Sequence, residues 1–471
     1  MKVIFLNPPV RDGPPPEKIF GCNYGIYPQQ NIFMLYPAAL LEREGYDVSF
    51  IDCPAEKLES FPSDGGLYVV ESVFLSEEND KRWAKTISEY ASVVFMGPEP
   101  TYRPGDFLLN DRCFVARGES EHTILELVRC LEADGGFDRV LGLSWRGVGG
   151  KVDNPPRPLL TNEELDALPF PARHLLRKEL YYNPKLLGRP SATLMASRNC
   201  YGRCIYCIPS SYTFAREIES RRFFHCKPKV GLRSPENIIK EFRQLRGEGY
   251  MSVAVLDDNF INGRERTIQI CEGVKDLGLE WGCLARADTI RDDGMVKAMA
   301  ESDCKYVDLG VESFRQEVLD FVKKDLLVED VERAIGLLKK HGIEPKINIL
   351  VGVSPMDSEE DIDLTVRKLR EMDIEYVSFS IAIPHPMTEL YRVALDSGWF
   401  KTGTGDFKPA DTYRESTIGH PGFSKTSLEE AVRRAYRRFY LNPSFIWKRL
   451  SGAGSLSRVL EDFRIALRLI R

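Results

Sequence analysis

The sequence predicts an α/β protein in which two series of parallel strands follow one another along the chain. Three observations predict this fold class. Short apolar runs alternate with helical patterns through most of the 471 residues. The alternation is interrupted by a proline-rich stretch between Asn154 and Pro171, and then resumes. Beyond Trp399 the strand signal stops and the pattern is helical.

The first series begins with KVIFLN at 2–7, which predicts a buried strand. A helix is predicted at 33–45, closed by Gly45, and the next strand at 47–52. Strand, helix and strand in this order imply a parallel, Rossmann-like layer. The pattern continues with strands at 67–70, 92–97 and 113–118 and helices at 77–90 and 120–131. We expect a first domain at 1–150 and a linker at 151–190, because five prolines break any regular element between Asn154 and Pro171.

The second series predicts a catalytic unit at 191–400. Its strands are expected at 192–197, 252–257, 281–287, 306–311, 347–353 and 377–383, separated by helical patterns such as those at 236–249 and 331–342. Six strands joined by crossovers indicate a partial (β/α)6 barrel, whose chemistry should lie at the carboxyl ends of the strands. The remainder, 401–471, is expected to form a helical C-terminal cap.

The composition bounds the class of protein. Apolar residues make up 43% and charged residues 28%, values close to those of ordinary globular proteins. A net charge of -6 argues against binding nucleic acid by bulk charge, so no nucleic-acid partner is expected. The start, MKVIFLNPPV, lacks the apolar core of a signal peptide, and no stretch has the length of a membrane span. We therefore expect a cytoplasmic location.

Eleven cysteines in such a chain indicate reduced thiols, metal ligands or catalysis rather than a disulfide framework. Cys200, Cys204 and Cys207 stand together in RNCYGRCIYC. Three thiolates from one loop can hold three irons of a cubane cluster and leave the fourth iron open. Two alternatives remain: a zinc site completed by His225 and Cys226 from the same crossover, or buried structural thiols.

Polar side chains stand at the carboxyl ends of three of the predicted barrel strands. They are Asp257 and Asp258 at the end of the second, Arg286 and Asp288 at the end of the third, and Glu312 and Ser313 at the end of the fourth. Since the carboxyl ends of barrel strands meet at one mouth, these groups would surround a ligand there. Each of them taken alone has a plainer alternative, a helix cap or a surface ion pair.

The cysteine loop and these strand ends resemble the radical S-adenosylmethionine (SAM) superfamily over about 191–395. In that family a CxxxCxxC loop follows the first barrel strand, with an aromatic residue, here Tyr206, before its last cysteine. The resemblance implies that SAM chelates the open iron of a 4Fe-4S cluster and that one electron cleaves it to a 5'-deoxyadenosyl radical. The electron would come from a donor such as ferredoxin or flavodoxin.

The same resemblance implies the SAM contacts. Arg286 suits the carboxylate of SAM and Glu312 its amine or ribose hydroxyls, with Tyr206, Asp258 and Ser313 as further cofactor contacts. The turn at 351–361 departs from the family pattern, because Ser-Pro-Met stands where Gly-Glu-Thr is common. His385, in the sixth-strand turn, is either a proton donor or a loop residue.

Residues 1–175 resemble the cobalamin-binding domain of one radical SAM subgroup, which includes tetrapyrrole cyclases and hopanoid-maturation enzymes. The matching segments are NPP after the first strand, YPAALLEREGYDVSFID, VARGESEHTILELV and NPPRPLL. The Asp-x-His-x-x-Gly cobalt-ligand signature is absent and the region 52–91 is short, so cobalamin binding stays open. Any cobalamin would lack a histidine below the cobalt, and Ile26, Tyr27, Phe33 and Tyr36 would cover that face.

Residues 424–471 carry eleven Lys and Arg against four acids, with aromatic residues between them. Two interpretations stand. The segment is a surface helix in peripheral contact with a membrane, or a helical cap that packs its aromatics on the barrel and leaves arginines outside. The arrangement also resembles subgroup members that act on tetrapyrroles or polycyclic lipids.

The sequence thus predicts a radical SAM enzyme that acts on an unactivated carbon of a small-molecule or lipid-like substrate. With cobalamin the expected reaction is methyl transfer. Without it, the expected reaction is a radical rearrangement, cyclisation or oxidation of a lipid or tetrapyrrole. The rival from another class is a non-catalytic metal-binding scaffold, which would not need polar residues at successive strand ends.

Overall fold

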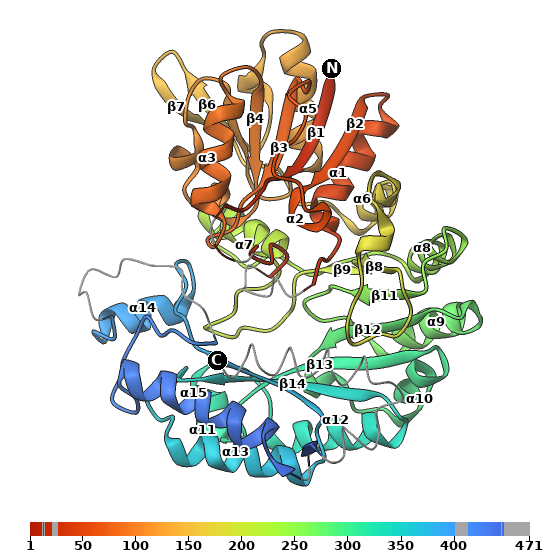
Figure 1. Cartoon of the computed structure of the whole chain (residues 1–471), viewed down its shortest axis with the longest axis vertical. Coiled ribbons are helices and arrows are strands. Elements are labelled where there is room, and N and C mark those ends of the chain that lie inside the picture. Colours follow the sequence, from red (N-terminus) through yellow and green to blue (C-terminus); the bar gives the residue numbers. More distant parts are fainter. Residues whose placement is uncertain (12, 14, 21–26, 401–412, 444, 447–471) are drawn as a thin grey trace.

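A computed structural model describes residues 1–11, 13, 15–20, 27–400, 413–443 and 445–446. Two sheets, each flanked by helices, lie one above the other (Figure 1). The N-terminal sheet has the strand order β2-β1-β3-β4-β5-β6-β7. Its strands are β1 (Lys2–Asn7), β2 (Asp47–Asp52), β3 (Leu67–Glu71), β4 (Ser92–Met96), β5 (Cys113–Ala116), β6 (Leu143–Gly147) and β7 (Gly150–Asp153). The first five pair in parallel, and β6 and β7 add an antiparallel hairpin.

Helices cover both faces of this sheet, which is why its central strands are continuous apolar runs. They are α1 (Ile32–Arg43), α2 (Cys53–Glu56), α3 (Glu77–Ile87), α4 (Pro98–Tyr102) and α5 (Glu121–Glu132). Helices α1 and α5 pack on one face and α3 on the other. The five parallel strands lie where the sequence predicts them, to within three residues at each end.

The hairpin of β6 and β7 was not predicted from the sequence. Its strands are short and polar, and only the first two residues of β6 are buried, so the apolar signal of a strand is missing. Strand β7 runs to Asp153, beyond the predicted boundary at 150. The predicted linker holds a short helix, α6 (Asn162–Ala167), which starts at a capping box of Thr161 and Glu164. Prolines flank this helix without entering it.

The second sheet has six parallel strands in the order β8-β11-β12-β13-β14-β15. They are β8 (Ser191–Leu194), β11 (Ser252–Val255), β12 (Glu280–Ala285), β13 (Cys304–Glu312), β14 (Glu344–Val351) and β15 (Tyr376–Ile381). All six overlap the strands predicted from the sequence. A short antiparallel pair, β9 (Ser197–Arg198) with β10 (Gly231–Leu232), lies beside the first crossover. The chain is therefore a mixed α/β protein.

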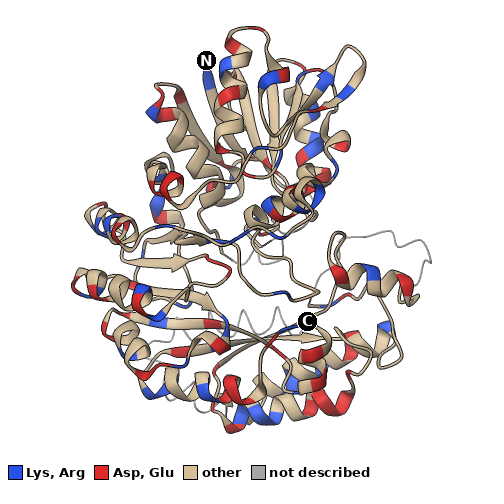
Figure 2. Ribbon diagram, turned by 180° about the vertical axis from the view of Figure 1, so that it is seen from behind, with Lys and Arg blue, Asp and Glu red and all other residues tan. Residues whose placement is uncertain are grey.

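Helices line the outer face of the second sheet (Figure 1). They are α8 (Pro235–Gly247), α9 (Arg264–Val274), α10 (Asp293–Glu301), α12 (Val328–Lys340) and α13 (Glu359–Glu371), with shorter α11 (Gln316–Phe321) and α14 (Glu389–Asp396) near the strand ends. Charged residues of both signs are mixed along these outer helices (Figure 2). The crossover from β8 to β11 contains a second helix, α7 (Ser211–Phe224), which lies between the two sheets.

The two faces of the second sheet differ in polarity, because side chains alternate along a strand. Residues such as Val307 and Leu309 of β13 belong to the core beneath the helices. Their neighbours point the other way, onto what we call the inner face. The inner face of the last three strands carries Tyr306, Asp308, Gly310, Glu312, Lys346, Asn348, Leu350, Ser378 and Ser380. It is therefore largely polar.

The C-terminal helix α15 (Lys425–Tyr440) packs against α13 and β15. Tyr436 and Phe439 are buried in the core of the second sheet, and the Tyr436 hydroxyl accepts a hydrogen bond from the Phe379 backbone nitrogen at 2.9 Å. For these residues the helical-cap interpretation holds, so they are not available to a membrane. Residues 401–412 and 447–471 of the predicted helical region, including Trp447, lie outside the described residues. No helix within the described part of the chain combines the length and apolar character needed to cross a bilayer.

Candidate functional site

The cysteine loop lies at the carboxyl end of β8, between β9 and α7, and its three cysteines are partly exposed. The Gly202 backbone nitrogen donates a hydrogen bond to Cys200 Sγ at 3.3 Å. A Cβ atom placed on Gly202 would lie 3.5 Å from Cys200 Sγ and 3.7 Å from Cys204 Sγ. The same position lies 2.9 Å from Arg286 Nη1, so the two sulfurs and the guanidinium converge beside Gly202, where a larger residue would clash with Arg286.

Within the described residues, no three His, Cys, Asp or Glu side chains are grouped to hold a single metal ion. His225 and Cys226 are both exposed. The zinc alternative therefore finds no support in the arrangement. A cubane cluster makes a different demand, because each thiolate binds a different iron and the sulfurs stand farther apart than ligands of one ion. The loop fits that demand in residue type, spacing and partial burial.

Cationic side chains surround the loop. Burial raises the pKa of the Cys200 thiol, while the Gly202 amide, Arg286 and Lys227 favour its thiolate. Lys227 Nζ donates to the Gly202 carbonyl oxygen at 2.6 Å. Such a setting stabilises the negative charge of a thiolate-bound cluster.

Arg286, at the end of β12, contacts the cysteine loop directly. Its Nη1 lies 3.8 Å from Cys204 Sγ, its Nε donates to Asp288 Oδ1 at 2.9 Å, and its Nη2 donates to the Lys324 carbonyl oxygen at 2.6 Å. The guanidinium is thus held between the loop and the segment after α11. The contact of Arg286 with the carboxylate of SAM remains a prediction. The structure adds a contact of Arg286 with the sulfur of Cys204.

Tyr206 and Glu312 meet through a residue that the sequence did not indicate. Lys324 Nζ donates to Glu312 Oε1 at 2.9 Å and to the Tyr206 hydroxyl at 3.0 Å. Glu312 has a left-handed φ of 68° and follows a register shift in β13 beginning at Gly310, an irregularity of the kind that re-aims a side chain. Lys324 sits in a turn between α11 and α12 with no motif, so only the fold brings it to the site.

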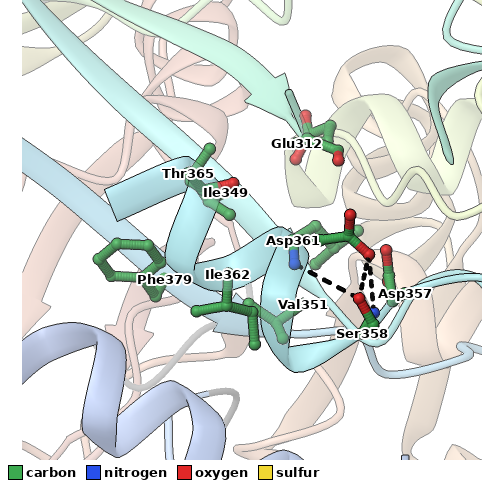
Figure 3. Close-up of a pocket in the computed structure, with 11 residues that line it drawn as sticks. Glu312, Ile349, Val351, Asp357, Ser358, Asp361, Ile362, Thr365 and Phe379 are labelled. Atoms are coloured by element: carbon green, nitrogen blue, oxygen red, sulfur yellow. Dashed lines mark hydrogen bonds between the residues drawn. The ribbon is translucent and has the colours of Figure 1, made fainter. Parts of the chain in front are cut away.

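Ser313 and Glu312 line a crevice together with the start of α13 (Figure 3). Asp357, Ser358 and Asp361 form its other side. Asp361 Oδ2 accepts from the Ser358 nitrogen at 2.9 Å, which caps the helix, and burial raises the pKa of Asp357 to about 7. The turn at 351–361, whose sequence differs from the family pattern, therefore lies beside the strand ends. Two of the carboxyl groups that line the crevice already have cationic partners, because Asp361 pairs with Arg315 at 3.0 Å and Glu312 with Lys324 at 2.9 Å.

The two aspartates after β11 act differently. Asp257 accepts from the Ala196 nitrogen and from Ser197 Oγ, both at 2.6 Å, and thereby ties β11 to the segment after β8. Asp258 Oδ1 accepts from the Ser210 nitrogen at 2.8 Å, just before α7. Asp258 thus contacts the residue that precedes α7, a role of the helix-cap kind named above as the alternative to cofactor binding. A cofactor contact by Asp258 remains a prediction.

A buried ion-pair network, also missed by sequence reasoning, links the N-terminal sheet to the cysteine loop. Glu119 Oε1, in the turn before α5, lies 2.7 Å from Arg198 Nη1 and 2.9 Å from Arg216 Nε. Arg198 also pairs with Glu121 at 2.7 Å, and Arg216 donates to the side chain of Asn199, next to Cys200. In the sequence, the segment VARGESE was noted only for its resemblance to the cobalamin-binding domain. Its ion pairs could not be predicted, because the partner arginines lie about eighty residues or more away.

The carboxyl edge of the N-terminal sheet faces the second sheet (Figure 1), and α7 packs against α4 at this edge. Phe33 and Tyr36 are buried in the core, with Phe33 stacked on Tyr212 of α7 at 5.4 Å between ring centroids. Tyr27 is partly buried, and Ile26 lies outside the described residues. That these residues cover a cobalamin face remains a prediction, and for Phe33 the structure adds a contact with α7.

His385 is also buried at this junction. Its ring lies against Phe74, after β3, and Phe214 of α7, with ring-centroid distances of 4.5 and 5.5 Å. Burial lowers its pKa to about 4, so the imidazole is neutral. It does not serve as a protonated acid at neutral pH, and the loop-residue interpretation fits its packing.

Comparison with known proteins identifies the family. The model of the radical SAM superfamily matches residues 194–369. An uncharacterized methyltransferase of Pyrococcus horikoshii is 30% identical over 87% of this chain and 88% of its own length. Cytidylyl-2-hydroxyethylphosphonate methyltransferase of Streptomyces wedmorensis is 25% identical, covering 82% of this chain and 81% of the relative. Anaerobic magnesium-protoporphyrin IX monomethyl ester cyclase of Rubrivivax gelatinosus is 26% identical, covering 95% and 78%.

Among solved structures, the radical SAM methyltransferase TsrM from Kitasatospora setae, with cobalamin and a 4Fe-4S cluster bound, has a similar fold. The TM-score is 0.66 at 16% identity, over 94% of this chain and 89% of that one. The likeness extends through both sheets, as the coverage shows. With the identity to the Pyrococcus relative over most of both chains, it follows that this chain is an enzyme of the radical SAM superfamily, with the two-sheet architecture found among its cobalamin-dependent members.

Proposed function

We propose that Cys200, Cys204 and Cys207 hold the 4Fe-4S cluster of this radical SAM enzyme at the mouth of a partial (β/α)6 barrel formed by β8 and β11–β15. One observation carries the proposal: the cysteine loop meets Arg286 and the Tyr206–Lys324–Glu312 contact at the carboxyl ends of these strands. When bound and reduced, the cluster supplies the electron that cleaves SAM into methionine and a 5'-deoxyadenosyl radical.

The protein side chains position the cofactor and shield the site. Arg286 holds the cysteine loop against the turn after α11 through its contacts with Cys204 and the Lys324 carbonyl oxygen. Lys324 orients Glu312, which reaches the crevice shared with Ser313 and Asp361. We place SAM along this edge, where carboxyl groups accept from the ammonium of its methionyl part and from the hydroxyls of its ribose.

We infer that the reaction is methyl transfer to an unactivated carbon of a small molecule. The methyltransferase names of two relatives, each covering more than four fifths of this chain, support this outcome. Helix α7 packs at the carboxyl edge of the N-terminal sheet, where Ser211 Oγ donates to Glu71 Oε1 at 2.7 Å. We assign no residue contacts to cobalamin and derive no step through it.

The packing of α7 favours a second candidate, a cobalamin-independent radical rearrangement, cyclisation or oxidation. Gel filtration after anaerobic incubation with hydroxocobalamin separates the two. Co-elution of corrinoid with the chain would support cobalamin-dependent methyl transfer. Corrinoid that elutes apart at saturating concentration would leave the second candidate.

The reductant is an external electron-carrier protein of the flavodoxin or ferredoxin kind. If α15 contacts an anionic membrane, the contact uses its exposed Arg433 and Arg437, because its aromatic side is buried. The two sheets support an N-terminal domain followed by a linker and a barrel at 191–400, with the N-terminal domain extended to Asp153 by β7.

The central experiment is anaerobic incubation of the purified, cluster-reconstituted chain with dithionite and SAM. We expect slow formation of 5'-deoxyadenosine without any substrate, because the cluster and SAM suffice for cleavage. Chromatography with mass detection measures the product. Its absence, with a full iron content, would contradict the proposed function.

The variants Glu312→Ala and Arg286→Ala should differ in their effects. Glu312→Ala is expected to weaken SAM binding about tenfold, by loss of a charged hydrogen bond, and to leave the iron content unchanged. Arg286→Ala should lower both SAM binding and iron content, because Arg286 also contacts Cys204. Equilibrium binding of SAM and iron analysis measure these effects. Unchanged SAM affinity in both variants would show that the SAM site lies elsewhere.

A further inference from the structure

Two lysines share one carboxylate on the inner face of the six-stranded sheet. Asp308 of β13 and Lys346 of β14 are neighbours in register, and Lys346 Nζ lies 3.7 Å from Asp308 Oδ1. Lys185, from the segment before β8, reaches the same group, with its Nζ 2.5 Å from Asp308 Oδ2. The segment around Lys185 therefore covers this part of the inner face.

Two lysine side chains face one carboxylate in this group, and the side chains of Lys185 and Lys346 are only 18% and 19% exposed. Burial and the nearby Lys346 lower the pKa of Lys185 to about 7, so the second positive charge is only partly present without a ligand. An oxyanion beside the two Nζ atoms would favour the charged form of Lys185 and accept hydrogen bonds from both lysines.

The surroundings are polar and already ordered. The Tyr306 hydroxyl accepts from Asn183 Nδ2 at 2.9 Å, and the Lys185 ammonium lies 4.7 Å from the centre of the Tyr306 ring. Asn348 and Ser378, in register on the next two strands, extend the inner face away from the lysines. A lipid would gain little on such a surface, whereas a polar anionic molecule would find donors.

The distance between the lysine pair and the candidate SAM site is one that a small substrate molecule can span. Asp308 and Glu312 lie on the same strand, and their partners on β14, Lys346 and Ile349, are three residues apart, which corresponds to about 10 Å along the sheet. A molecule whose anionic group contacts Lys185 and Lys346 would extend toward the strand ends, where the radical is expected. This step rests on the proposed function.

We propose that Lys185, Lys346 and Asp308 form a substrate subsite for a compact oxyanion, such as a phosphoryl, phosphonyl or carboxylate group. Lys185 and Lys346 bind the oxyanion by charge-assisted hydrogen bonds, and Asp308 holds the two lysines on the inner face. The substrate of this chain is then a polar anionic small molecule, rather than the lipid or tetrapyrrole named among the sequence-based alternatives.

Isothermal titration of the full-length, cluster-reconstituted chain tests the subsite, with inorganic phosphate and acetate as separate probes. Lys185→Met and Lys346→Met are each expected to weaken binding of the probe about tenfold or more. Each variant leaves Asp308 paired with the other lysine, so folding should persist.

Lys297→Met is the matched control, since Lys297 is 62% exposed on α10 and pairs only with Glu301 among the described residues. Equal affinity in the lysine variants and the wild type, or no binding of either probe, would overturn the subsite. Binding of phosphate alone assigns a phosphoryl or phosphonyl group, and binding of acetate alone a carboxylate. The titration needs no SAM cleavage, so its failure is distinguishable from the failure of 5'-deoxyadenosine formation.

Discussion

Replacing Cys200, Cys204 and Cys207 together with alanine is expected to abolish both the iron-sulfur absorption and all 5'-deoxyadenosine formation. The three thiolates are the protein ligands of the proposed cluster, and no reduced cluster means no electron for SAM. The fold should survive, because these side chains are only partly buried and pack little apolar surface. Visible absorption, iron analysis and circular dichroism of the anaerobically reconstituted protein measure the result.

Cys226→Ala is the matched control. Cys226 lies in the same crossover and is exposed, so the zinc alternative would make it a ligand whereas the cluster proposal does not. We expect its absorption and turnover to equal those of the wild type. Iron-sulfur absorption that persists in the triple variant would show that other residues bind the cluster.

The second sheet could be predicted almost strand by strand because helices cover its outer face. The outer positions of its strands are therefore apolar at every second residue, as in INILVGV and VSFSIAI. The cysteine spacing is likewise local, and so are Arg286 and Glu312, which stand at the ends of predicted strands. These features could be predicted because each is contained in a short, continuous stretch of sequence.

Other parts of the site depend on contacts between distant segments. Lys324 reaches Glu312 and Tyr206 from a turn without a motif, and Lys185 reaches Asp308 across 123 residues. A lysine in such a segment is most often solvated, so sequence gives no reason to single it out. The same holds for the contact between Phe33 and Tyr212, because Tyr212 belongs to a helix far along the chain.

Loss of the buried ion-pair network around Glu119 is expected to lower the stability of the protein strongly. Glu119→Ala would leave Arg216 buried without its carboxylate partner, while Arg198 would keep Glu121. Removing one partner of a buried ion pair costs about 3–5 kcal/mol, because the remaining charge is uncompensated. Leu160, whose backbone nitrogen donates to Glu119 Oε2 at 2.7 Å, would also lose its acceptor. We expect the apparent free energy of unfolding by urea, followed by fluorescence, to fall by that amount.

The effect should reach the cluster, because Arg216 bonds to Asn199 and Asn199 precedes Cys200. We expect the Glu119→Ala protein to bind less iron than the wild type at equal folded fraction. Glu126→Ala is the control: Glu126 also pairs with an arginine, Arg157, but its side chain is 37% exposed, so we expect a loss below about 1 kcal/mol and an unchanged iron content. Equal stability and iron content in both variants would mean that the network does not position the cysteine loop. A loss of stability with full iron content would limit its role to joining the two sheets.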